Sequence, residues 1–194
     1  MDLSNSKNLK RTPCFKGMQK LERLDFSGCI SLYDVHPSIG LLRELQFLRL
    51  QNCTSLVCFE FGRVSKSSSL RVLCLSGCTK LENTPDFEGL LNLEYLYMDQ
   101  CTSLYTIHKS IGDLTNVRFL SLRGCTNLVG IPDSFNDMTN LVTLDICGCS
   151  RFTNVPLGSI SSSHTQQSLI SLDLSFCNIS IVPDAIGETK FTGQ

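Results

Sequence analysis

Residues 70–81 read LRVLCLSGCTKL, and this stretch recurs along the whole chain in the frame L-x-x-L-x-L-x-x-C-x-x-L. Further copies begin at Leu21, Leu45, Leu93, Val117, Leu141 and Leu169. In the copy at Leu169 the last apolar residue, Ile179, comes one place earlier. Successive starts at 21, 45, 70, 93, 117, 141 and 169 differ by 24, 25, 23, 24, 24 and 28 residues. Self-similarity at a fixed period indicates a repeat architecture.

The spacing inside each copy predicts a leucine-rich-repeat solenoid. Two leucines in L-x-L lie two residues apart, so both side chains point to one face of a strand and into the coil. The period near 24 falls within the range of about 20–29 residues for such repeats. We therefore expect an α/β solenoid of horseshoe shape, with a parallel β-sheet on the concave face and irregular or short-helix returns on the convex face.

The repeats are expected to fill residues 1–187, as about eight copies of which the first is truncated. Met1, Leu3, Ser6 and Leu9 fit the frame of that first copy, and residues 188–194 are expected to form a non-repeat tail. Both ends look truncated, as in a partial gene product or an excised fragment. Prolines support the frame, because a residue without an N–H suits the point where the chain leaves the strand side. Four prolines fall at repeat position sixteen, and two lie one place away: Pro13, Pro85, Pro132 and Pro156, then Pro37 and Pro183.

Seven of the eleven cysteines occupy the ninth position of the repeat: Cys29, Cys53, Cys78, Cys101, Cys125, Cys149 and Cys177. This position is usually Asn, and a thiol can replace it as a small apolar group with a weak donor. No C-x-x-C pair with zinc-ligand spacing occurs. The polar start of the chain lacks a secretory leader, which argues against a disulfide framework. We predict that the cysteines are reduced and buried, and that these seven form a structural ladder.

Composition and motifs exclude several function classes. The net charge of −1 argues against nucleic-acid binding through bulk electrostatics. No apolar run of about 18 residues predicts a membrane span. No phosphate-binding loop, dinucleotide fingerprint or HExxH motif occurs. His36 and His108 lie three coils apart, so they cannot share a metal ion or form a catalytic pair. We therefore predict no enzyme activity, no catalytic or metal-binding residue, no cofactor and no small-molecule substrate.

The outward strand positions predict a protein-binding face. Positions three, five and seven project onto the concave side, where a solenoid usually binds its partners. At position three, four neighbouring coils form an apolar ridge: Phe47, Val72, Tyr95 and Phe119. The ridge is flanked by Arg49, Tyr97, Asp99 and Arg123. Aromatic residues and Arg carry much of the energy at interfaces. The alternative is that position three is half-buried against its neighbours at the strand entrance.

The segments LERLDFSGCISL, LVTLDICGC and SLDLSFCNISIVPDAIG resemble the leucine-rich repeats of plant intracellular immune receptors. They are most similar to the TIR–nucleotide-binding–leucine-rich-repeat class of disease-resistance proteins, from Met1 to about Gly187. The resemblance implies a non-enzymatic recognition module in the cytoplasm or the nucleus. Its concave face would bind a pathogen effector, a guarded host protein or the receptor's own nucleotide-binding domain.

Two alternatives remain open for the function. One is the substrate adaptor of a ubiquitin ligase, which an F-box-like helical segment before the repeats would favour. The other is an extracellular receptor ectodomain, which a signal peptide, paired capping cysteines and an asparagine ladder would favour. The sequence shows neither set of features. The nucleotide-binding and signalling domains of the receptor class match no residues of this chain.

Overall fold

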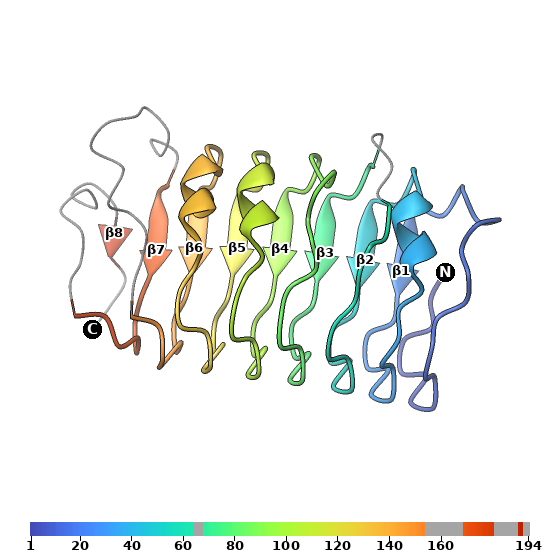
Figure 1. Cartoon of the computed structure of the whole chain (residues 1–194), viewed down its shortest axis with the longest axis horizontal. Coiled ribbons are helices and arrows are strands. Elements are labelled where there is room, and N and C mark those ends of the chain that lie inside the picture. Colours follow the sequence, from blue (N-terminus) through green and yellow to red (C-terminus); the bar gives the residue numbers. More distant parts are fainter. Residues whose placement is uncertain (64–67, 154–168, 181–189, 192–194) are drawn as a thin grey trace.

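The computed structural model describes residues 1–63, 68–153, 169–180 and 190–191. Its eight strands form one parallel sheet in chain order, from β1 to β8. Figure 1 shows these strands side by side along the length of the molecule. Their bounds are Arg23–Asp25 (β1), Phe47–Arg49 (β2), Val72–Cys74 (β3), Tyr95–Tyr97 (β4), Phe119–Ser121 (β5), Thr143–Asp145 (β6), Ser171–Asp173 (β7) and Lys190–Phe191 (β8). The predicted parallel-sheet solenoid is confirmed.

The sheet keeps one register from β1 to β7. Phe47 pairs with Val72, Val72 with Tyr95, and Tyr95 with Phe119. Each repeat position therefore stands beside the same position in the next coil. Because side chains alternate between the two faces of a strand, the register turns every repeat position into a column that runs along the solenoid.

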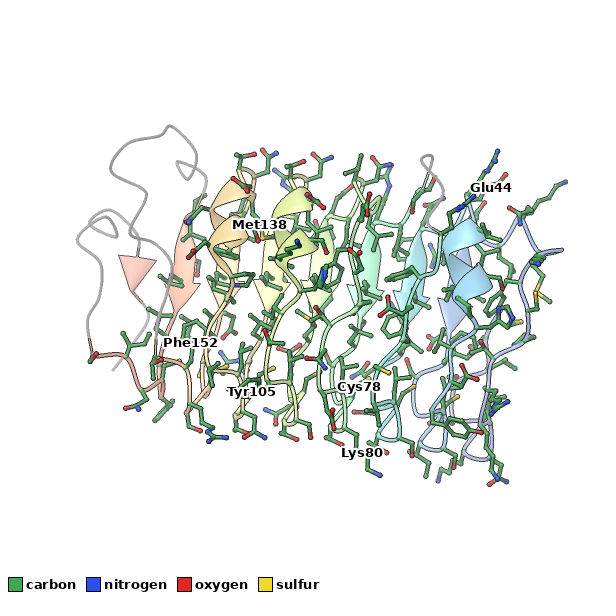
Figure 2. All side chains as sticks on the ribbon, in the orientation of Figure 1. Glu44, Cys78, Lys80, Tyr105, Met138 and Phe152 are labelled. Atoms are coloured by element: carbon green, nitrogen blue, oxygen red, sulfur yellow. The ribbon has the colours of Figure 1, made fainter. Side chains whose placement is uncertain are left out.

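The core consists of the inward columns. In the copy at residues 70–81, Leu73, Leu75, Cys78 and Leu81 are all fully buried. Lys80, between two of them, points away from the coil (Figure 2). Each coil buries its leucines against both neighbours, and removing one such side chain typically costs about 2–5 kcal/mol. The fold is thus stabilised by contacts between adjacent repeats, which position the strands.

The cysteine ladder joins each coil to the one before it. The Cys78 thiol donates a hydrogen bond to the backbone oxygen of Leu50 at 3.1 Å. The other six make the equivalent bond to the preceding coil, and all seven distances lie between 3.0 and 3.3 Å. All eleven cysteines are free thiols. The prediction that every cysteine is buried was wrong: Cys14 and Cys58, which lie outside the ladder position, are exposed, and Cys74 and the last ladder residue, Cys177, are only partly buried.

A left-handed residue precedes each ladder position and turns the chain out of the strand. It is glycine in four coils: Gly28, Gly77, Gly124 and Gly148, with φ between 71° and 77°. In the others the same conformation is adopted by Asn5, Asn52, Gln100 and Phe176. Only glycine takes this conformation without a steric penalty. The turn fixes where the outward side chains beyond the strand are placed.

Short 3₁₀ helices form three of the convex returns, as expected. They span Pro37–Leu41 (η1), Lys109–Asp113 (η2) and Asp133–Asp137 (η3). His36 and His108 cap η1 and η2, because the Nδ1 atom of each accepts a hydrogen bond from a serine N–H two residues later. Both histidines therefore have a structural role. Of the prolines used to set the frame, Pro156 and Pro183 lie outside the described residues.

The two ends of the chain extend the same lattice. The N–H of Leu3 donates to the oxygen of Asp25 at 2.8 Å, so the expected truncated first copy packs against β1. At the other end, β8 pairs with β7, although the sequence predicted no strand in the tail. Without β8, this edge of β7 would present unpaired backbone groups, which any extended segment can pair with. The repeat boundary at residue 187 lies outside the described residues and stays a prediction.

Candidate protein-binding face

The outward columns place the predicted ridge on one surface. On β4, Tyr95 and Tyr97 are half-buried, whereas Leu96 between them is fully buried. Phe47, Val72 and Phe119 are half-buried as well. The ridge side chains thus lie beside one another along the sheet and leave part of their surface exposed to solvent. The outward direction predicted for the ridge and the half-burial that was the alternative to it are thus present together.

A groove of about 790 Å³ lies over β2, β3 and β4. Six of the eight predicted binding residues line it: Phe47, Arg49, Val72, Tyr95, Tyr97 and Asp99. The lining also includes residues outside the predicted face: Gln51, Asn52, Cys74, Ser76, Gly77 and Gln100. Most of these belong to repeat positions seven and eight. Polar residues recur at these positions from coil to coil, and this recurrence is a sequence signal that could have added them to the predicted binding face. The groove therefore has an apolar floor and a polar margin.

Aromatic contacts define the two ends of the groove. The Arg23 guanidinium lies over the Phe47 ring, 4.4 Å from its centroid. At the other end, the rings of Tyr97 and Phe119 pack with centroids 5.1 Å apart. Burial raises the pKa of the Tyr97 hydroxyl, with smaller effects from Tyr95 and nearby acidic groups. The Tyr97 phenol is therefore neutral at physiological pH.

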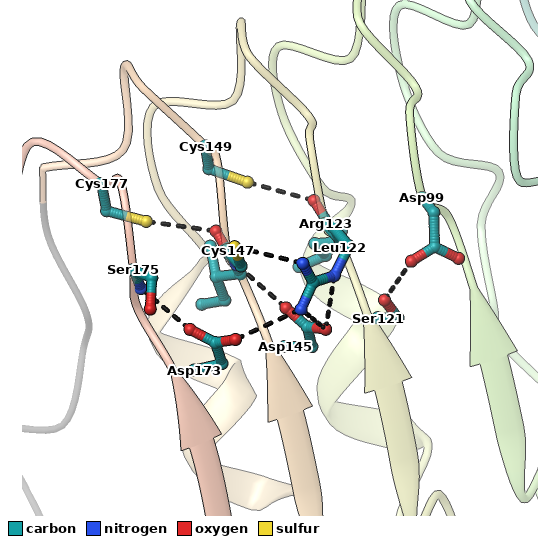
Figure 3. Close-up of polar contacts among 11 residues, drawn as sticks. Asp99, Ser121, Leu122, Arg123, Asp145, Cys147, Cys149, Asp173, Ser175 and Cys177 are labelled. Atoms are coloured by element: carbon teal, nitrogen blue, oxygen red, sulfur yellow. Dashed lines mark hydrogen bonds and ion pairs between the residues drawn. The ribbon is translucent and has the colours of Figure 1, made fainter. Parts of the chain in front are cut away.

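Arg123, the eighth predicted residue, is engaged beyond the groove in a cluster over β5–β7 (Figure 3). Its guanidinium pairs with Asp145 at 2.9 Å and with Asp173 at 3.2 Å. It also donates to the Cys147 sulfur at 3.3 Å. Burial acts to raise the pKa of Asp173, but hydrogen bonds from Ser175 and the Arg123 charge outweigh it, and the net pKa is lowered. We call these four side chains the Arg123 cluster.

The Arg123 cluster contains the metal-type donors that the described residues bring together. Atoms of Asp145, Cys147 and Asp173 lie within 4.8 Å of one another. The guanidinium of Arg123 already contacts all three, so a positive charge stands where a cation would be held. The cluster is thus a set of internal ion pairs.

Burial makes the ladder thiols poor nucleophiles, because the reactive form is the thiolate. Desolvation raises the pKa of Cys53 to about 12 and that of Cys177 to about 11. Desolvation also raises the pKa of Cys78 well above its ordinary value. By contrast, a backbone hydrogen bond from Lys16 lowers the pKa of the exposed Cys14 thiol. Ladder cysteines are therefore structural.

Comparison with known proteins agrees with this geometry. The family profile described as Leucine Rich Repeat matches residues 168–188. Among solved structures, the leucine-rich repeat domain of the type III effector XopL superposes with a TM-score of 0.76 at 24% identity, covering 94% of this chain and 62% of that one. InlP of Listeria monocytogenes superposes with a TM-score of 0.53 at 20% identity, covering 83% of this chain and 51% of that one. The chain therefore has the leucine-rich-repeat fold.

Sequence relatives of this leucine-rich-repeat chain are plant disease-resistance proteins. TMV resistance protein N of Nicotiana glutinosa is 36% identical over 111 residues, which are 57% of this chain and 9% of the relative. Disease resistance protein RPP2A of Arabidopsis thaliana is 34% identical over 113 residues, which are 58% of this chain and 8% of the relative. The resemblance inferred from the sequence is confirmed. The chain spans less than a tenth of the length of either relative.

The repeats thus form a solenoid whose sequence is similar to segments of plant disease-resistance proteins. Among the residues that the structure describes, no helix has the length and hydropathy needed to cross a membrane.

Proposed function

We propose that the chain is a non-enzymatic recognition module of a plant immune receptor, acting in the cytoplasm or the nucleus. Its partner is a protein: a pathogen effector, a guarded host protein or the nucleotide-binding domain of the receptor itself. The proposed binding face consists of the eight residues named from the sequence. Nucleic acid, membranes and small-molecule substrates have no part in this proposal.

The observation that carries the proposal is the groove over β2–β4. It combines half-buried aromatic side chains with Arg49, and aromatic residues and arginine are the residue types that dominate interface energetics. The floor is formed by outward strand residues, so the leucine core holds it rigidly. A preformed surface loses little conformational entropy when a partner binds. The similarity to disease-resistance proteins supports the choice of partner.

The test is to remove an aromatic anchor from the groove. Tyr97→Ala deletes a ring that lines the groove and packs on Phe119. We expect a loss of about 2 kcal/mol of binding free energy, which is roughly 30-fold in affinity. Affinity is measured by titration calorimetry against a nucleotide-binding domain of the receptor class and against a panel of effectors.

The matched control is Tyr105→Ala. Tyr105 is 56% exposed and is not part of the groove lining. Figure 2 shows it among the turns at the lower edge of the solenoid. We expect it to leave binding unchanged. Equal effects of the two substitutions on a partner that binds the unaltered chain would contradict the proposal, provided that thermal melts show both variants folded.

A further inference from the structure

The carboxylates on the outward columns differ in their partners. Asp25 lies 3.7 Å from Arg49, and Arg123 pairs with both Asp145 and Asp173. Asp99 forms no ion pair with any residue that the structure describes. Its two carboxylate oxygens accept hydrogen bonds from the hydroxyls of Ser76 and Ser121. Asp99 is thus the concave carboxylate whose charge no arginine of the described chain neutralises.

Arg123 follows Asp99 in the same column, one coil further along, yet points the other way. Figure 3 shows its guanidinium directed at Asp145 and Asp173, while Asp99 faces Ser121. Three bonds hold Arg123 in that direction. The arginine of the neighbouring coil is therefore already engaged, and the negative charge of Asp99 remains at the margin of the groove.

Two tyrosine side chains, Tyr95 and Tyr97, lie near the Asp99 carboxylate. Tyr97 precedes Asp99 by two residues, so the two side chains leave the same face about 7 Å apart. Tyr95 and Tyr97 both line the groove with Asp99. An aromatic ring attracts a cation to its face, and a carboxylate pairs with it at close range. Both features together fit the flat guanidinium of arginine, which stacks on a ring and presents donors to a carboxylate.

We propose that the groove binds an arginine side chain of the partner protein, with the guanidinium on the Tyr97 ring and paired with Asp99. This inference rests on the proposed function and names the chemistry of the partner. The serine hydroxyls use one acceptor site of each Asp99 oxygen, and a carboxylate oxygen has a second. The apolar floor at Val72 and Phe47 receives neighbouring apolar side chains of the same segment.

Charge at the other end of the groove orients that segment. Arg49 lines the groove there, and Arg23 covers Phe47 beside it. Two cationic side chains disfavour a second cation and favour an acidic or neutral one. A partner segment that carries both an acidic residue and an arginine would therefore place the acidic residue near Arg49 and the arginine near Asp99.

The test uses two short peptides and the whole chain. Acetyl-Leu-Arg-Leu-amide is compared with the same peptide carrying citrulline, which has the shape of arginine without its charge. Binding is followed through the amide NMR signals of Tyr97 and Asp99 as peptide is added to millimolar concentration. We expect the arginine peptide to shift both signals and to bind about tenfold more tightly than the citrulline peptide.

Two variants locate the effect. Asp99→Asn keeps the side-chain shape and should abolish the preference for arginine over citrulline. Asp137→Asn removes an exposed carboxylate on η3, outside the groove lining, and should leave the preference intact. Equal binding of both peptides, no shift at Tyr97 and Asp99, or an unchanged preference in Asp99→Asn would overturn the inference.

The same variants separate this inference from the proposed function. If Tyr97→Ala weakens binding of a protein partner and Asp99→Asn does not, the groove binds the partner without an arginine, so the inference falls and the proposed function stands. If neither substitution affects a partner that binds the unaltered chain, the proposed function fails with it.

Discussion

Two regions of one concave face handle charge in opposite ways. Over β5–β7 the Arg123 cluster neutralises itself, because Asp145 and Asp173 occupy position five of the coils that Arg123 faces. Over β2–β4 the same position holds Cys74 and Tyr97 on β3 and β4, while Arg49 on β2 pairs with Asp25, so Asp99 has hydroxyl partners only. The comparison indicates that a repeat lattice leaves a charge for a partner wherever the neighbouring column offers no opposite charge that is still unpaired.

The largest expected effect lies beneath the groove, at Leu96. Its side chain is fully buried, whereas Tyr97 beside it is half-buried. Leu96→Asp places a carboxylate in an apolar core and should cost more than about 4 kcal/mol, a large part of the roughly 5–15 kcal/mol that stabilises a typical domain. Tyr97→Ala should cost roughly 1 kcal/mol. Urea denaturation measures both, and comparable losses would mean that the inward and outward columns are misassigned.

Alkaline pH should lower the free energy of unfolding, because the cysteine ladder beneath both regions consists of buried thiols. Burial raises the pKa of Cys53 from its ordinary 9.0 to about 12, and Cys78 shifts in the same direction. Above pH 9 the unfolded thiol ionises while the folded thiol stays protonated, so the free energy of unfolding falls until the pH passes the folded pKa. Each fully buried thiol contributes about 1.4 kcal/mol per pH unit in that window.

Cys78→Ala provides the control for this pH dependence. It removes one ladder thiol, so urea midpoints measured between neutral pH and pH 11 should fall less steeply than in the unaltered chain. Identical slopes would show that the ladder thiols do not titrate as buried groups.

A matched glycine pair compares the turns of the two regions. Gly77 lines the groove and Gly148 lies in the turn after β6, with φ of 76° and 77°. Gly148→Ala should cost about 1–2 kcal/mol from backbone strain alone. In Gly77→Ala the new Cβ would also lie 2.0 Å from the Asn52 Oδ1 atom, whose side chain must move. Thermal melts should therefore rank Gly77→Ala as the more damaging, and the opposite order would mean that the turn at Asn52 is placed wrongly.

The smallest expected effect distinguishes the two charge arrangements. Arg123→Ala leaves Asp145 and Asp173 side by side without a cation and should cost about 1 kcal/mol, because the guanidinium is half-exposed. Asp99→Asn removes no ion pair and should change the free energy of unfolding by less than about 0.5 kcal/mol. High salt should reduce the difference. A larger loss for Asp99→Asn would mean that its charge stabilises the fold.

The sequence alone predicts the columns, because the two-residue alternation in L-x-L and the constant period determine which residues face outward. It therefore predicts the ladder and six of the groove-lining residues. It does not predict that Arg123 points toward Asp173, since that direction depends on side-chain rotamers and on hydrogen bonds across two coils. It also missed the left-handed turn residue, although Gly28, Gly77, Gly124 and Gly148 recur at one position.

A second ladder escaped the sequence analysis as well. Asn92, Asn116 and Asn140 stand just before the first apolar residue of their copies. Each donates from its Nδ2 atom to a backbone oxygen of the preceding coil. The pattern is visible in the sequence, but its meaning depends on which backbone oxygens the returns leave unpaired, and only the structure shows these.

The most direct test of the central claim is photocrosslinking from the groove. Benzoylphenylalanine replaces Tyr97 in one preparation, Tyr105 in a second and Ser175, beside the Arg123 cluster, in a third. Each preparation is irradiated with a protein partner that binds the unaltered chain. The account predicts a covalent adduct from position 97, a weaker one from position 175 and none from position 105. Adducts from position 105 with none from position 97 would contradict the claim that the groove over β2–β4 is the binding surface.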